Sequence, residues 1–322
     1  MKILRTLFLF VVLILMTGTN AWAGLLKDQT LIVNGKKRSY DIYVPNRHFK
    51  KPLPLVLLLH GHMGDADVMT GENHKKAPYK LWLKVAERDG WVVLVPDGEY
   101  GSDNNRGWND CRGNAKTNPQ VDDMAFLGLL LDKITREYPV NSRRIFAHGT
   151  SNGGNMVYRL AQETPERFRA MAAIVAAMPE YNKCKESTRP ISILIMNGTD
   201  DPLLPYSGGR VGKREKDKDQ RGSVLSTQQT LQYWLKRDGI TSMPQEKDLP
   251  DTNKRDGSTV HVKLYTGGKN NTEVMLYEVR GGGHTEPSRL EHYRRIYKLI
   301  VGPQNKDIEM VDEVVRFFDS QL

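Results

Sequence analysis

A serine lies at the centre of the pentapeptide Gly149-Thr150-Ser151-Asn152-Gly153, after a short apolar run and before a helix-favouring run. Strand, sharp turn and helix are the setting in which Gly-x-Ser-x-Gly presents a serine as a nucleophile. The two glycines lack the Cβ atoms that would obstruct so tight a turn. The helix that follows directs its positive N-terminal end toward the site, where an oxyanion can form. The pattern predicts that Ser151 is a nucleophile, although a glycine-rich turn with an incidental serine fits the pentapeptide too.

A serine hydroxyl reacts usefully only when a base takes its proton and an acid orients that base. In chains with this turn, the acid follows a later strand and the histidine comes last. Asp200 and Asp201 follow the apolar run 191–196 directly after Asn-Gly-Thr, and they are alternative candidates for the acid. His284 comes after three glycines at the end of the last predicted strand and is the expected base. The other histidines precede Ser151 or lie within a predicted strand or helix.

The oxyanion of an acyl-transfer intermediate requires two backbone N–H donors. One is expected from Asn152, directly after the nucleophile. The second is expected from the loop 60–64, His-Gly-His-Met-Gly, which follows a buried strand and whose glycines let the backbone approach a substrate. Within that loop, His62 is the first candidate and Met63 the second.

The segments around these residues predict an α/β fold. Continuous apolar runs are typical of strands buried on both faces, and two β-prone runs across Asn34-Gly35 predict an antiparallel hairpin. Strands that alternate with helices predict a mostly parallel central sheet covered by helices on both faces. Besides the strand and helix around Ser151, the expected strands are 31–44 (as the hairpin), 54–59, 90–95, 170–177, 191–196, 260–265 and 273–279, and the expected helices are 80–89, 124–138, 224–236 and 308–318.

The charge of the chain is basic but dispersed, with a formal net charge of +9 over 322 residues. The densest charged run, 213–221, mixes both signs and is typical of a solvated loop. Because aromatic and basic residues do not interleave, nucleic-acid binding is not expected, whereas attraction to an acidic surface stays open. Without an internal repeat or a Pro/Ser-rich linker, residues 24–322 are expected to form one domain.

Residues 1–23 have the pattern of a secretory signal peptide. Lys2 and Arg5 precede ten apolar residues, and Ala21-Trp-Ala23 offers a small-x-small cleavage site. The apolar run is too short to span a bilayer. We therefore expect a secreted or periplasmic protein with no stable membrane anchor after cleavage.

The two cysteines, Cys111 and Cys184, can form one disulfide in an oxidising compartment or remain separate thiols. Neither Cys-x-x-Cys nor His-x-x-x-His occurs in the sequence, so a metal site is not expected.

Taken together, these segments resemble the secreted α/β-hydrolase esterases of the polyhydroxybutyrate depolymerase family, which are close to feruloyl and acetylxylan esterases. The resemblance implies the α/β-hydrolase fold, no cofactor, and Asp201, the aspartate before proline, as the acid of the triad. It places Trp108 near the active site, where the indole either binds substrate or packs on the domain. It also supports a bridge between Cys111 and Cys184. The matching segments are Leu59–Gly64, Gly107–Asn109, Val121–Asp123, Gly149–Gly154, Asn197–Gly209 and Gly281–Thr285.

The resemblance implies a serine esterase whose substrates are hydroxyalkanoate oligomers or short esters. Feruloyl or acetylxylan esters of plant polysaccharide are the alternative substrates, and a serine peptidase is a further enzymatic alternative. A non-catalytic binding protein with a hydrolase fold is the alternative from another class. Glu286 stands where many relatives have tryptophan, so the family's substrate specificity does not carry over to this chain. The oligomeric state does not follow from the sequence.

Overall fold

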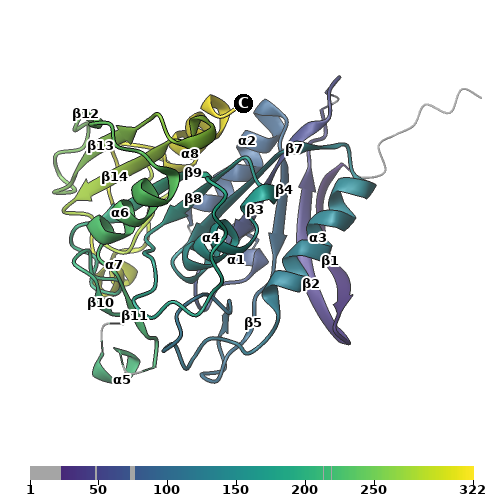
Figure 1. The fold of residues 1–322 in the computed structure, drawn as a ribbon, viewed down its shortest axis with the longest axis horizontal. Coiled ribbons are helices and arrows are strands. Elements are labelled where there is room, and N and C mark those ends of the chain that lie inside the picture. Colours follow the sequence, from purple (N-terminus) through teal and green to yellow (C-terminus); the bar gives the residue numbers. More distant parts are fainter. Residues whose placement is uncertain (1–22, 48, 73–76, 213, 219) are drawn as a thin grey trace, which may run out of the picture.

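The computed structural model describes residues 23–47, 49–72, 77–212, 214–218 and 220–322. The predicted signal peptide falls almost entirely on residues 1–22, outside the described residues. A ten-stranded sheet runs through the molecule in the order β1-β2-β4-β3-β7-β8-β9-β14-β13-β12 (Figure 1). Its strands are β1 (Gly24–Val33), β2 (Lys36–Val44), β3 (Leu53–Leu59), β4 (Val92–Pro96), β7 (Val140–Thr150), β8 (Ala170–Ile174), β9 (Ser192–Gly198), β12 (Gln245–Asp248), β13 (Thr259–Tyr265) and β14 (Val274–Arg280).

The middle of the sheet, from β4 through β3, β7, β8 and β9 to β14, is parallel throughout. The pairs at both ends of the sheet are antiparallel. The β1–β2 hairpin turns at Asn34-Gly35, where both residues have positive φ, as the sequence predicted. The late strands β13 and β14 are also confirmed, and the short 3₁₀ helix Lys269–Asn271 lies between them.

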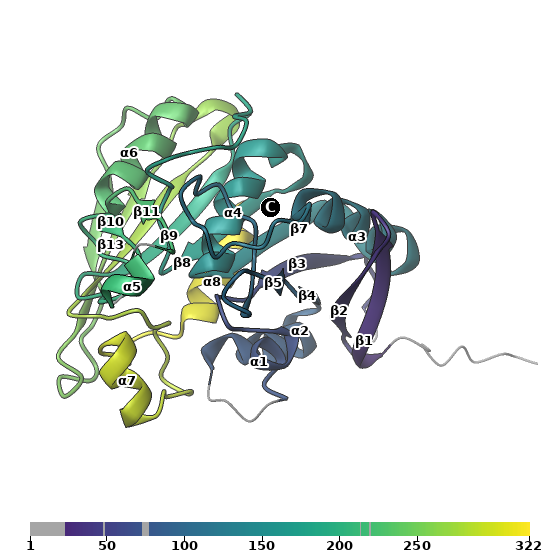
Figure 2. The same ribbon diagram turned by 90° about the horizontal axis from the view of Figure 1, so that it is seen from below.

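Helices cover both faces of the sheet (Figures 1 and 2). One core cluster joins α3 (Asp123–Glu137), α4 (Asn152–Glu163) and α6 (Thr227–Asp238) to strand residues such as Leu55 and Leu57. The other joins α2 (Leu81–Asp89) and α8 (Met310–Ser320) to the alternate strand residues Val56 and Leu58. The strand β3 therefore buries side chains on both faces, which explains its continuous apolar sequence.

Several short elements complete the structure: α1 (Ala66–Thr70), η1 (Pro78–Lys80), β5 (Glu99–Tyr100), β6 (Arg106–Gly107), η2 (Pro165–Arg167), β10 (Gly209–Arg210), α5 (Glu215–Lys218), β11 (Ser223–Val224) and α7 (Arg295–Val301). The predicted helix 224–236 starts too early, because Val224 pairs with Gly209 and the helix begins after Ser226. The Ser226 hydroxyl caps that helix by accepting the N–H of Gln229 at 3.0 Å. Within the described residues, no helix is both long and apolar enough to cross a bilayer.

Candidate active site

Ser151 lies at the turn between β7 and α4 with φ 53° and ψ −120°, a conformation that a non-glycine residue adopts only under constraint. The flanking glycines make this turn possible. A Cβ at Gly153 would lie 2.3 Å from the carbonyl oxygen of Leu59, and a Cβ at Gly149 would lie 2.3 Å from that of Gly153. The hydroxyl is thus held at the carboxyl edge of the central strands, as the sequence predicted for a nucleophile turn.

The structure brings Ser151, His284 and Asp201 into one series of hydrogen bonds. Nε2 of His284 lies 2.9 Å from Oγ of Ser151, and Nδ1 lies 2.6 Å from Oδ2 of Asp201. Because the carboxylate can only accept, the proton on the ring lies on Nδ1, and Nε2 presents its lone pair to the hydroxyl. This arrangement can move a proton from the serine to the imidazole while the carboxylate orients the ring.

The two candidate acids differ clearly in their surroundings. Asp201 is buried, and its other oxygen accepts the N–H groups of Leu203 and Leu204, both at 2.8 Å. Asp200 is exposed, and its carboxylate accepts the hydroxyl of Thr199 at 2.7 Å. Asp201 is therefore the carboxylate that contacts the imidazole, whereas Asp200 stabilises its own turn.

The loops that carry the acid and the base are tied to each other. The N–H of Asp200 donates to the carbonyl of Gly282 at 2.9 Å, and the N–H of His284 donates to the carbonyl of Val301 at 2.6 Å. A Cβ at Gly198 would lie 2.2 Å from the oxygen of Gly282, so this close approach requires a glycine. Backbone contacts thus fix the position of the imidazole of His284 relative to the carboxylate of Asp201.

The pH dependence of activity follows from the surroundings of His284. Burial alone would lower the pKa of this imidazole, but the charge of Asp201 and the hydrogen bond to it raise the pKa above its ordinary value of 6.5. A general base works in its neutral form, so kcat/KM is expected to rise through a midpoint above pH 6.5. The check is the pH profile of kcat/KM on p-nitrophenyl acetate. A midpoint below 6.5 would contradict this prediction.

The backbone N–H of Asn152 is suited to an oxyanion hole because the first N–H groups of a helix have no partner within the helix. Of the two candidates in the loop after β3, Met63 already donates its N–H to the carbonyl of Arg106 at 2.9 Å. His62 is the candidate that remains, in a loop where a Cβ at Gly61 would lie 3.3 Å from Cβ of Ser151. The geometry is therefore compatible with His62 and Asn152 as the two donors.

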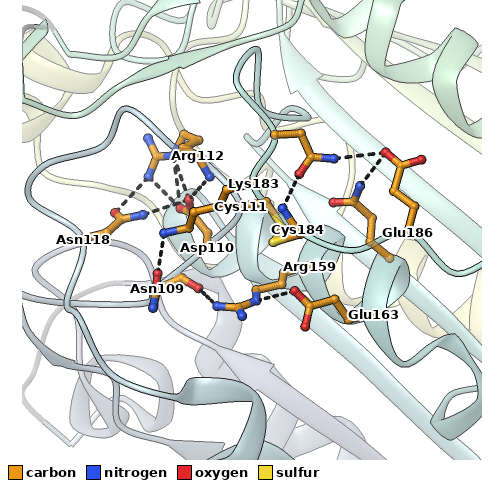
Figure 3. The surroundings of a disulfide bond; sticks show 12 residues. Asn109, Asp110, Cys111, Arg112, Asn118, Arg159, Glu163, Lys183, Cys184 and Glu186 are labelled. Atoms are coloured by element: carbon orange, nitrogen blue, oxygen red, sulfur yellow. Dashed lines mark hydrogen bonds and ion pairs between the residues drawn. A yellow bond between two sulfur atoms is a disulfide. The ribbon is translucent and has the colours of Figure 1, made fainter.

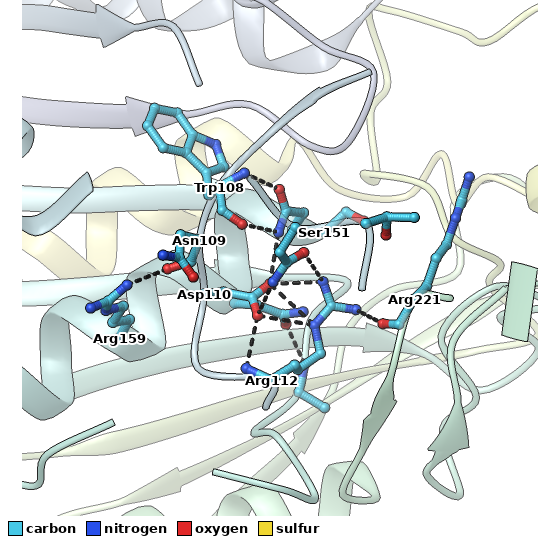
Figure 4. Close-up of polar contacts among 12 residues, drawn as sticks. Trp108, Asn109, Asp110, Arg112, Ser151, Arg159 and Arg221 are labelled. Atoms are coloured by element: carbon cyan, nitrogen blue, oxygen red, sulfur yellow. Dashed lines mark hydrogen bonds and ion pairs between the residues drawn. The ribbon is translucent and has the colours of Figure 1, made fainter. Parts of the chain in front are cut away.

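Trp108, Asp110 and Arg112 belong to a buried polar cluster (Figure 4), and this cluster holds the side chain of Asn152 in place. Its side-chain oxygen accepts the N–H of Trp108 at 2.6 Å, and its side-chain nitrogen donates to Asp110 at 2.7 Å. Burial would raise the pKa of Asp110, but the charge and hydrogen bonds of Arg112 lower it below its ordinary value. Arg112 reaches this carboxylate at 2.7 Å and also donates to the carbonyl of Arg221 at 2.7 Å. Asp110 and Arg112 were not among the predicted site residues, and their positions on either side of Cys111 were the available signal.

Trp108 is fully buried, so its indole does not present a ring face to a substrate. The ring packs 5.0 Å from that of His60, and its N–H donates to the carbonyl of His60 at 2.9 Å. Nε2 of His60 accepts the N–H of Gly98 at 2.8 Å, so His60 is also a structural residue. The predicted substrate contact of Trp108 is therefore corrected to its alternative, packing on the domain.

Cys111 and Cys184 form a disulfide, the pairing that the family resemblance supported (Figure 3). The bridge fastens the loop after Trp108 to the segment that follows β8. Lys183 strengthens the same junction, because its ammonium donates to the side chain of Asn109 at 2.8 Å and its N–H donates to the carbonyl of Cys111 at 3.0 Å. The bridge lies directly beside Asp110, the carboxylate that holds Asn152.

Glu286 is a second buried acid close to the nucleophile, and its role was not foreseen. One carboxylate oxygen accepts the hydroxyl of Thr150, next to Ser151, and the other accepts that of Tyr293. Gln304 donates to the backbone carbonyl of Glu286 at 2.9 Å. Glu286, which stands where many relatives have tryptophan, therefore packs beneath the turn that carries Ser151.

Comparisons with known proteins find similarity to a peptidase family and to proteins named as esterases. Residues 79–201 match the Prolyl oligopeptidase family, a segment that includes Ser151 and Asp201. The Putative esterase NocK of Nocardia uniformis subsp. tsuyamanensis is 26% identical over 89% of this chain and 80% of its own length. Feruloyl esterase B of Piromyces equi is 27% identical over 73% of this chain, but the match spans only 40% of that enzyme.

Among solved structures, the acetyl xylan esterase from Aspergillus awamori aligns with a TM-score of 0.52 at 15% identity. The alignment covers 82% of this chain and 94% of that enzyme. At this identity the likeness concerns the fold. The parallel strands, the helices on both faces and this neighbour together confirm the predicted architecture. The chain has the α/β-hydrolase fold, and its relatives support a hydrolase that acts on esters.

Proposed function

We propose that this protein is a serine esterase that works through an acyl-enzyme. Oγ of Ser151 attacks the ester carbonyl carbon while Nε2 of His284 accepts the hydroxyl proton. When the tetrahedral intermediate collapses, the C–O bond to the alcohol breaks and His284 returns the proton to the leaving alkoxide. The observation that carries this proposal is the hydrogen-bonded series from Ser151 through His284 to Asp201.

In the second half of the reaction, water replaces the alcohol. His284 takes a proton from the water, whose oxygen attacks the acyl carbon. The bond to Oγ of Ser151 then breaks, and His284 returns the proton to that oxygen. The backbone N–H groups of Asn152 and His62 stabilise the oxyanion in both halves. Donors fixed before the reaction cost little reorganisation, and the cluster around Asp110 supplies that fixation for Asn152. The carboxylic acid leaves and the enzyme is regenerated.

The proposed substrates are feruloyl or acetyl esters of plant polysaccharide, with hydroxyalkanoate oligomers or short acyl esters as the second candidate. The order follows the relatives, which include feruloyl esterases and a bifunctional acetylxylan esterase/xylanase of Neocallimastix patriciarum. Because Glu286 and Trp108 are buried, neither side chain is expected to contact the substrate and determine its selection. Parallel assays on methyl ferulate, acetylated xylan and a hydroxybutyrate trimer decide between the two classes.

We also propose that residues 1–23 direct export and that residues 24–322 act as one catalytic domain outside the cytoplasm. The Cys111–Cys184 bridge supports this location, because disulfides persist in oxidising compartments. Both core clusters share the strands of one sheet, which supports a single domain.

A fluorophosphonate probe tests the central proposal. The probe is expected to label the wild type covalently and to leave Ser151→Ala unlabelled, because only an activated serine displaces the fluoride. Ser142→Ala is the control, since Ser142 is exposed at the other end of the same strand and should leave labelling unchanged. A folded wild type that stays unlabelled would favour the non-catalytic binding protein instead.

A further inference from the structure

An unusual share of exposed apolar surface lies in the segment Arg289–Val301, which we call the α7 segment. Four aliphatic side chains of the segment are more than half exposed, and Tyr297 is 45% exposed. The four are Leu290 (64%), Ile296 (74%), Leu299 (71%) and Ile300 (53%). Isolated apolar side chains are normal on protein surfaces, but a contiguous group marks an interaction site. The α7 segment therefore has the character of an interaction surface.

The helix α7 has two distinct faces. Val301 is buried, and its backbone carbonyl accepts a hydrogen bond from the N–H of His284. Ile296, Leu299 and Ile300 follow the i, i+3, i+4 spacing of a helix face and are all exposed. Figure 2 shows α7 at the edge of the molecule, away from the β1–β2 hairpin. The apolar stripe of α7 thus faces outward rather than into the core.

Basic residues flank this apolar stripe. Arg289, Arg294, Arg295 and Lys298 lie in the segment. Arg289 pairs with Asp312 at 3.9 Å, and the one acidic residue of the segment, Glu291, pairs with Lys80 at 2.9 Å. Arg294 and Arg295 are exposed, and neither forms an ion pair with a carboxylate in the part of the chain that the structure describes. The segment therefore combines an aliphatic face with uncompensated positive charge.

We propose that the α7 segment is a docking surface for an anionic lipid bilayer. Aliphatic side chains of this kind enter the boundary between headgroups and acyl chains, while arginine and lysine bind the anionic headgroups. The net charge of +9, which falls to +7 once Lys2 and Arg5 leave with the predicted signal peptide, strengthens the same attraction over longer distances. A second copy of this chain fits less well, because a two-fold contact through α7 would bring like charges together.

Docking in this way would bring the active site to the lipid surface. The carbonyl of Val301 accepts the N–H of His284 at 2.6 Å, and the carbonyl of Pro303 accepts that of Gly283 at 2.8 Å. A single backbone hydrogen bond thus links Val301, the last residue of the exposed helix, to His284, the proposed base. The delivery of bilayer-dissolved esters to Ser151 rests on the proposed function, whereas the docking itself does not.

The test is co-sedimentation with vesicles, using Ser151→Ala protein purified after export so that catalysis plays no part. Binding to vesicles of equimolar phosphatidylcholine and phosphatidylglycerol is expected, with weaker binding to phosphatidylcholine alone and in high salt. The double substitution Ile296→Ser/Leu299→Ser is expected to weaken binding about tenfold or more, and so is Arg294→Gln/Arg295→Gln.

The matched control is Ile32→Ser/Lys36→Gln/Lys37→Gln on the β1–β2 hairpin. It changes an apolar residue that is 63% exposed and two exposed lysines. This variant should bind anionic vesicles nearly as well as its parent. Equal losses for the hairpin and α7 variants, or no vesicle binding by the parent, would overturn the proposal. So would a dimer in solution that the α7 substitutions dissociate, since a second copy would then occupy the surface. The α7 substitutions are also made in protein that retains Ser151. Fluorophosphonate labelling of these variants tests the proposed function separately from docking.

Discussion

His284→Ala is expected to lower kcat/KM for p-nitrophenyl acetate by about 10⁴-fold to 10⁶-fold. The imidazole is the group within reach of the Ser151 hydroxyl, 2.9 Å away, and alanine leaves that hydroxyl without a base. The residual rate would come from the oxyanion donors, which the substitution does not touch. Steady-state kinetics at pH 8 measure the effect.

The fold should survive this change, because the backbone N–H of residue 284 still donates to Val301. Circular dichroism and a thermal melt verify that point. His292→Ala is the control, since His292 is exposed in the same stretch of chain and should leave the rate on a small soluble ester unchanged. A His284→Ala rate within tenfold of wild type would remove this residue from the mechanism.

The second large effect is expected from Asp201→Asn, with a loss of about 10⁴-fold in kcat. The amide preserves the shape of the side chain but no longer stabilises the imidazolium, and it favours the wrong tautomer of His284. Asp200→Asn is the matched comparison, one residue away, and should retain most of the activity because its carboxylate contacts Thr199 and not the imidazole. Turnover of both variants on the same ester provides the measurement. A reversed order of the two losses would assign the acid to Asp200.

Sequence patterns predicted the centre of the fold well because burial on both faces leaves a strong signature. The strands β3 and β4 are continuous apolar runs, and β9 has an apolar centre from Ile193 to Met196. All three belong to the parallel part of the sheet. The turn at Ser151 was equally recognisable, since steric crowding there admits only glycine at 149 and 153.

The edges of the fold were harder to predict. The strand β12, with the sequence Gln-Glu-Lys-Asp, is exposed throughout and carries no alternation of polar and apolar residues. The predicted strand 170–177 ends at Ile174, because Val175 has a φ of 44° and leaves the sheet. In both places, pairing with neighbours determines the structure more than local sequence does.

The supporting residues of the site were the least predictable. The Ser-Asp-His order follows from the architecture, but nothing in the local sequence links Asp110 to Asn152 or Glu286 to Thr150, which are 42 and 136 residues apart. These pairs form only when distant loops meet at the edge of the sheet. The indole of Trp108 was ambiguous for a related reason, since a loop position in the sequence does not reveal whether the side chain points inward.

The disulfide has a consequence for the denatured ensemble. Its sulfurs are 73 residues apart, and the covalent ring that they close encloses α3, β7, α4 and β8. In the chain-entropy account, closing a ring of this size disfavours the unfolded chain by roughly 4 kcal/mol. Even after complete loss of tertiary structure, Ser151 and the strands β7 and β8 on either side of it remain within one covalent ring. Refolding therefore begins with this part of the central sheet already confined.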